Sequence, residues 1–86
     1  MTTTQLLRET VLAHRYDLRQ YREALYQQRA YVEELAAGIA NNLGDSSQEA
    51  ISSIPGQLET HVKLLSDLIT GTNKIMGDLG AYVRAL

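Results

Sequence analysis

Apolar residues recur along the first half of the chain with alternating steps of three and four residues. The series runs from Leu7 to Ile39, and no Gly or Pro interrupts residues 5–37. This spacing keeps one line of side chains on the same side of a helix, as where two helices wind around each other. It predicts a helix over about residues 4–41, opened by a capping box at Thr2–Gln5. The predicted contact row is Leu7, Val11, His14, Leu18, Tyr21, Leu25, Gln28, Val32, Leu35 and Ile39.

The second half repeats this spacing and adds a second apolar row, which predicts a helix over about residues 47–86. The main contact row is predicted at Ile51, Ile54, Leu58, His61, Leu65, Leu68, Thr72, Ile75, Leu79, Tyr82 and Leu86. The second row follows a seven-residue interval at Val62, Ile69, Met76 and Val83. About three apolar positions per heptad form a wider stripe than one neighbouring helix covers. The second helix therefore indicates an additional partner surface.

Turn-forming residues separate the two helices at about residues 42–46. Gly44 can take the left-handed conformation that ends a helix, and Ser46 to Glu49 match a second capping box. Pro55 conflicts with an uninterrupted second helix, because a mid-helix Pro costs roughly 3 kcal/mol. Either a new helix begins near Pro55, or one helix continues through a kink.

These elements predict an all-α fold with a single domain over residues 1–86. Two helices of some 35 residues, each about 52 Å long, must lie antiparallel when a short turn joins them. The predicted architecture is an antiparallel two-helix hairpin that completes a four-helix bundle with a partner or a second copy. A chain of 86 residues without Cys has no disulfides to support a small core. Docking to another protein is the remaining source of stability.

Charge and hydropathy narrow the classes of function. The formal net charge is −2, which does not favour binding to nucleic acid or to anionic lipid. No run of about 18 apolar residues predicts a membrane-inserted helix. The first residues lack the basic and apolar segments of a cleaved secretory signal, so a cytoplasmic location is predicted.

No catalytic, cofactor-binding or metal-binding residues are predicted. The two histidines, His14 and His61, lie in the predicted contact rows and have no second His or carboxylate suitably spaced on the same side. No combination of nucleophile, base and orienting group is recognisable, and a zinc site would need more His or Cys ligands. The sequence therefore predicts a non-enzymatic protein.

An arginine row follows a seven-residue interval along the first helix, at Arg8, Arg15, Arg22 and Arg29. One interpretation is a basic ridge for phosphate or for an acidic partner. The other is a solvated flank, because the five arginines of this helix are balanced by five acidic residues. The second interpretation is favoured.

Around the turn, the segment from Asn42 to Ile51 resembles the small W-x-G proteins of bacterial type VII secretion systems. Leu43, Gly44 and Asp45 form the turn motif: Leu43 stands where the family has Trp, and Asp45 where it has Gly. The export signal of the family, a Tyr followed four residues later by an acid, is not intact, because Tyr82 is present but Leu86 stands where the acid would be. The resemblance implies a divergent member that acts as a targeting or chaperone-like partner of an exported effector or a sister hairpin. It implies a bacterial cytoplasmic protein, with type VII export as the alternative.

The expected function is thus binding to another helical protein, with a hetero-oligomer favoured and a homodimer possible as a self-assembling adaptor or structural coiled coil. A nucleic-acid or membrane-surface binder that uses the arginine row is the least favoured binding class. The predicted partner-binding residues are Leu18, Leu25, Val32, Val62, Leu65, Ile69, Ile75, Met76, Leu79 and Val83.

Overall fold

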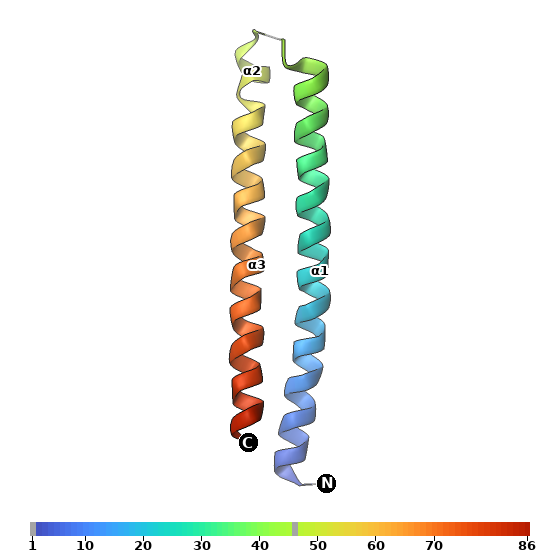
Figure 1. Cartoon of the computed structure of the whole chain (residues 1–86), viewed down its shortest axis with the longest axis vertical. Coiled ribbons are helices and arrows are strands. Elements are labelled where there is room, and N and C mark those ends of the chain that lie inside the picture. The colour runs from blue at the N-terminus through green and yellow to red at the C-terminus, as the bar shows by residue number, and fades with distance from the viewer. Residues whose placement is uncertain (1, 46) are drawn as a thin grey trace.

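Two long helices run side by side in opposite directions and form a rod (Figure 1). The computed structural model describes residues 2–45 and 47–86. Helix α1 spans Thr3–Leu43, α2 is a single turn over Glu49–Ser52, and α3 spans Ile54–Ala85. The rod measures 66 × 14 × 14 Å, and its radius of gyration of 19.5 Å exceeds the roughly 12 Å of a compact domain of this length. The predicted all-helical hairpin is confirmed.

The two ends of α1 are closed differently. At the start, the Gln5 amide donates to Thr2 Oγ1 at 3.1 Å, and the Thr2 amide donates to Gln5 Oε1 at 3.0 Å, so the predicted capping box is present. At the other end, Gly44 has φ −61° and ψ −23°, a right-handed conformation. The predicted left-handed cap is therefore wrong, because the Gly44 amide instead continues the helical pattern by donating to the Ala40 carbonyl at 3.1 Å.

A single turn residue, Ser53, separates α2 from α3, and its backbone is in the right-handed helical region. Pro55 lies in the first turn of α3, where the missing N–H has no helical acceptor and its absence costs nothing. The N-cap of α2 is Gln48, whose side chain makes no capping hydrogen bond. Ser46, the first residue of the second predicted capping box, lies outside the described residues.

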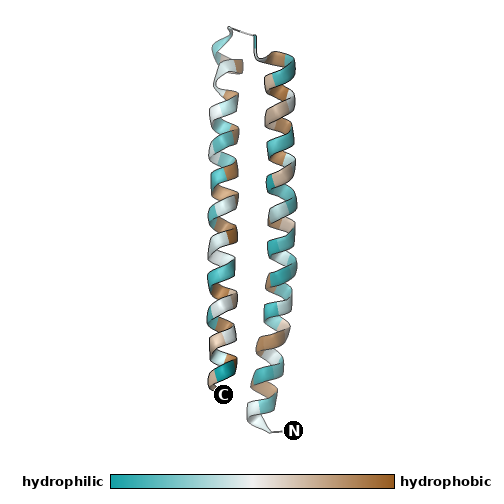
Figure 2. Ribbon diagram, viewed as in Figure 1, coloured by the Kyte–Doolittle hydropathy of each residue, from teal (hydrophilic) through white to brown (hydrophobic). Residues whose placement is uncertain are grey.

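The contact between α1 and α3 is one line of side chains on each helix, called here the seam. All its members are buried or half-buried. On α1 they are Val11, Arg15, Leu18, Arg22, Leu25, Arg29, Val32, Ala36 and Ile39. On α3 they are Leu58, Val62, Leu65, Ile69, Thr72, Met76, Leu79 and Val83. Figure 2 shows hydrophobic segments recurring along α3, whereas the middle of α1 is mostly hydrophilic.

The aliphatic core within the seam is small. Leu25, Leu65 and Ile69 form its centre, with half-buried Val32 against them. Thr72 is only 4% exposed, and its hydroxyl donates to the Leu68 carbonyl at 2.7 Å, so no polar group is stranded there. No large side chain among the described residues is completely buried. Two helices alone therefore shield little apolar surface.

At every second position, the seam is shifted by one residue from the predicted contact rows, and at the other positions the two agree. On α1 the arginines Arg15, Arg22 and Arg29 are half-buried against α3, whereas Arg8 is exposed. The favoured interpretation of a solvated flank is therefore wrong for three of the four arginines in the row. The residues immediately before these three are exposed. On α3 the all-aliphatic row that starts at Val62 faces α1, whereas the row that starts at His61 is exposed. Burying the latter would have required partners for an imidazole and a phenol.

Candidate partner-binding surface

An exposed apolar surface, called here the apolar face, flanks the seam on one side. It is formed by Leu7, His14, Tyr21, Gln28 and Leu35 of α1 and by His61, Leu68, Ile75 and Tyr82 of α3. Its six large apolar side chains are between 40% and 51% exposed. These residues are the predicted contact positions that the other helix of the hairpin leaves uncovered.

Helix geometry places both rows of this face on the same side of the rod. Each row precedes a seam row by one residue, which is a rotation of about 100° away from the opposite helix. Reversing the direction of a helix reverses its sense of rotation, and α3 also faces the opposite way from α1. Equal offsets in an antiparallel pair therefore fall on the same side, and the two rows form one surface.

The rows next to the apolar face, which include residues 10, 17, 24 and 31 of α1 and residues 64, 71 and 78 of α3, are mostly uncharged. Tyr31 and Leu64 lie there and are 61% and 58% exposed. Asp17 and Asp78 are the charged residues at these bordering positions. Asp78 accepts a hydrogen bond from Lys74 Nζ at 2.8 Å, and this bond together with the carboxylate charge raises the pKa of Lys74. The carboxylate of Asp78 is thus paired with a lysine one helical turn away on α3.

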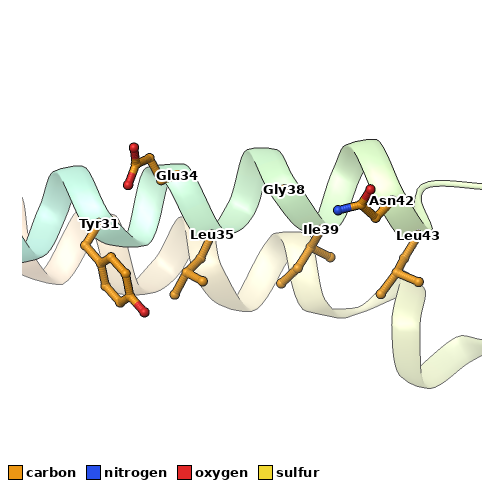
Figure 3. Close-up of a pocket in the computed structure, with 7 residues that line it drawn as sticks. All are labelled: Tyr31, Glu34, Leu35, Gly38, Ile39, Asn42 and Leu43. Atoms are coloured by element: carbon orange, nitrogen blue, oxygen red, sulfur yellow. The ribbon is translucent and has the colours of Figure 1, made fainter.

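A shallow hollow of about 350 Å³ lies at the turn end of this face, on α1. Tyr31, Leu35, Ile39 and Leu43 point to the same side of the helix, and Gly38 leaves a gap between them (Figure 3). A Cβ atom at Gly38 would meet no atom within 4 Å. Such a gap in a row of apolar side chains suits a bulky side chain of another helix.

On the other side of the seam, three seam arginines form a ladder with small or polar residues of α3. Arg22 Nη1 donates to Asn73 Oδ1 at 2.6 Å, and Arg29 Nη1 donates to Ser66 Oγ at 3.2 Å. The Arg15 guanidinium carbon lies 3.4 Å from where a Cβ of Gly80 would be. We call Arg15, Arg22 and Arg29 the arginine ladder; their counterparts on α3 are also seven residues apart.

The arginine ladder has little countercharge within the described residues. Arg29 Nε lies 4.0 Å from Glu33 Oε1, and the Arg29 guanidinium lies 5.2 Å from the centre of the Tyr26 ring. No ion pair involves Arg15 or Arg22 in the described part of the chain. Arg15 Nε is buried and has no hydrogen-bond acceptor. The cost of this burial is reduced because the aliphatic arginine stems pack in the seam.

Nine of the ten predicted partner-binding residues lie in the seam itself. Ile75 is the exception, since it is 51% exposed on the apolar face. Of the turn motif, Leu43 ends α1 and is 44% exposed, and Gly44 and Asp45 form the turn that follows. Partner binding by the seam residues stays a prediction. In the hairpin, the seam residues of α1 are already covered by α3, and those of α3 by α1.

The two histidines lie far apart along the rod. His14 faces the Tyr82 end of α3, and His61 faces the Leu35 end of α1, so about 20 residues of helix, or roughly 30 Å, separate them. Within residues 2–45 and 47–86, no three His, Asp or Glu side chains group closely enough to hold a metal ion.

Sequence reasoning missed Leu64 as a member of an exposed apolar surface. The width of the second apolar stripe indicates such a surface, but half of the contact row that the spacing predicts on this helix, from His61 to Tyr82, is exposed. No helix in the described stretches is long and apolar enough to pass through a lipid bilayer. No family model matches the chain, and neither a curated protein nor a solved structure is found to be similar to it.

Proposed function

We propose that this chain is a non-enzymatic partner protein that packs its apolar face against a second helical protein and completes a four-helix bundle. The observation that carries the proposal is the exposure of two parallel apolar rows on one side of the hairpin. Contiguous apolar patches of more than a few hundred Å² are uncommon on monomers and mark interaction sites.

The surface area of the hairpin supports a companion of substantial size. The chain exposes 6388 Å², against about 5,100 Å² for a compact monomer of 9.6 kDa, an excess of about 1,300 Å². A standard protein–protein interface removes about 800 Å² from each partner. The excess surface is therefore sufficient for one stable interface along the rod.

The shape of the apolar face favours a helical occupant. Its rows are straight and repeat every seven residues, and from Leu7 to Leu35 they extend about 42 Å along α1. Helices with the same repeat fit their ridges into such rows over the whole length. A compact globular surface would contact only part of the rod.

Two kinds of helical partner are open. The resemblance of the turn to the W-x-G proteins favours a sister hairpin or a type VII-exported effector, which would place the chain in the bacterial cytoplasm or among exported proteins. The alternative is a second copy, which would make the chain a self-assembling adaptor or structural coiled coil. Sedimentation of the isolated chain separates them, because only the alternative gives a stable homo-oligomer.

The apolar face is tested by adding charge at its centre without touching the seam. The variant is Leu68→Asp with Ile75→Asp, and the matched control is Ala81→Asp on the exposed back of α3. Leu65→Asp or Ile69→Asp would not serve, because these side chains are buried against α1 and the hairpin itself would unfold. Each tagged form is expressed in the organism from which the chain comes and is purified by its tag. Proteins that co-purify in an amount equal to that of the chain are identified by mass spectrometry.

We expect the unaltered chain and the Ala81→Asp control to retain one helical protein in equal amount. The doubly charged variant should lose it while keeping its helical circular dichroism. Retention of that protein by the charged variant would contradict the proposed surface. A homo-oligomer that the charged variant dissolves would establish the second-copy alternative.

A further inference from the structure

The arginine ladder places three positive charges in the contact between the two helices, and among the described residues only Arg29 has a carboxylate beside it. Arg15, Arg22 and Arg29 are all half-buried, and each guanidinium carries five N–H donors. Among the described residues, Arg22 uses one donor on Asn73, and Arg29 uses one on Ser66. Arg29 also has the Glu33 carboxylate 4.0 Å from its Nε, whereas Arg15 and Arg22 have no ion pair among the described residues. A guanidinium without a carboxylate partner retains donors for one, to which its hydrogen bonds are about twice as strong.

We propose that the arginine ladder is a second docking surface, which binds a partner helix that carries carboxylates at every seventh residue. This surface lies on the side of the seam opposite the apolar face and does not depend on the function proposed above. Arg15 Nε is shielded from solvent and has no acceptor, so a partner would bind the other N–H groups of that guanidinium.

The spacing of the ladder indicates that the acidic partner is a helix. Successive arginines are seven residues apart, which is about 10.5 Å along α1. A second helix that lies along the first presents side chains at the same interval when its acidic residues recur every seven positions. Leu12 and Tyr26 flank the ladder and are 45% and 39% exposed, so such a helix would also gain apolar contact.

Neither a second copy nor a nucleic acid matches the ladder as well. No two of the ten acidic residues of the chain are seven positions apart, so the chain lacks the required acidic row. The net charge of −2 also opposes accumulation of the chain on nucleic acid.

The test uses a synthetic amphipathic helix of four heptads with Glu at every seventh position, and the same peptide with Gln at those positions. Binding to the full chain is measured by titration calorimetry at low and at physiological salt. Arg22→Gln and Arg29→Gln each remove one ladder charge. Lys74→Gln removes one charge from the exposed back of α3 and is the matched control. Circular dichroism checks that every form is folded.

We expect the Glu peptide to bind the unaltered chain and Lys74→Gln equally, and each ladder variant at least about tenfold more weakly. Binding should weaken as salt rises, and the Gln peptide should bind at least about tenfold more weakly than the Glu peptide. The variant Leu68→Asp with Ile75→Asp should bind the Glu peptide normally, which separates this surface from the apolar face. Equal binding of the two peptides, no effect of the ladder variants, or tighter binding of a 20-base-pair DNA duplex would overturn the proposal.

Discussion

The two sides of the seam differ in chemistry although the same two helices and the same seven-residue repeat build both. One side carries the apolar face, with exposed side chains such as Tyr21 and Leu68. The other side carries the arginine ladder, with Arg22 bound to Asn73. A rotation by one residue would exchange the roles of neighbouring rows. The comparison shows that a heptad repeat establishes that helices pair, but not which of two adjacent rows they bury.

The largest effect is expected in the seam that both sides share. Leu25→Asp replaces a side chain that is 4% exposed in the aliphatic core. Removal of such a leucine costs about 2–5 kcal/mol before the buried charge is counted, and a small core rarely supplies more than about 3–5 kcal/mol. We expect the chain to lose its helical circular dichroism at 25 °C. Leu64→Asp, at a position that is 58% exposed, should stay folded; equal loss in both variants would show that the seam is misplaced.

A smaller effect of opposite sign is expected where the ladder crosses the seam. Arg22→Leu removes a half-buried charge and adds apolar contact beside Leu25, while water replaces the lost bond at exposed Asn73. Replacing partly buried ionic groups by apolar ones is commonly neutral or stabilising, so we expect a gain of about 1 kcal/mol in the free energy of unfolding. Urea denaturation measures it. A loss of similar size would mean that the ladder supports the fold instead of serving a partner.

A comparable gain is expected from two glycines that belong to different sides. A Cβ atom at Gly71 or at Gly77 would meet nothing within 4 Å, so each change to Ala should raise the free energy of unfolding by about 0.5–1 kcal/mol. Gly71 borders the apolar face and Gly77 does not. Only Gly71→Ala should therefore weaken retention of the partner, because the added methyl group prevents close approach of the partner's backbone. Equal retention by the two variants would remove Gly71 from the docking surface.

The smallest effect is expected at the Lys74–Asp78 pair. The hydrogen bond and the charge of Asp78 raise the pKa of Lys74 above 10.5, so any stability from the pair is complete below pH 10.5 and is lost as the pH rises through the raised value. Both groups are exposed to water, which screens their attraction. We expect Lys74→Gln to leave the melting temperature at neutral pH unchanged; a clear drop would indicate that Asp78 disturbs the apolar face when its lysine is absent.

The helices and the hairpin could be predicted from sequence because the three-and-four spacing survives an error of one residue. Val11, Leu18, Leu25 and Val32 belong to the contact row in either assignment. The seam positions that alternate with these four residues could not be predicted in the same way. Counting apolar residues favours His14, Tyr21 and Gln28, whereas the structure places the half-buried Arg15, Arg22 and Arg29 in the seam. Their long stems pack there, and their charged ends reach small or polar residues of α3. That choice depends on the facing helix and not on α1 alone.

The candidate surface was harder to predict than the fold for the same reason. Ile75 was assigned to a partner and is exposed, whereas Leu65 and Ile69 were assigned to a partner and are used within the hairpin. Until the register between the helices is known, the residues left over for a partner cannot be identified. The left-handed cap at Gly44 failed for a local reason, since the backbone simply continues its right-handed turn there.

The shallow interior, in which no large described side chain is fully shielded, has a consequence for the amount of protein in a cell. A companion that recognises only the folded hairpin draws the equilibrium away from opened forms in proportion to its own concentration. Copies made in excess of that companion spend more time open and are exposed to proteases. On the proposed function, the supply of this chain would thus be matched to that of its companion by turnover.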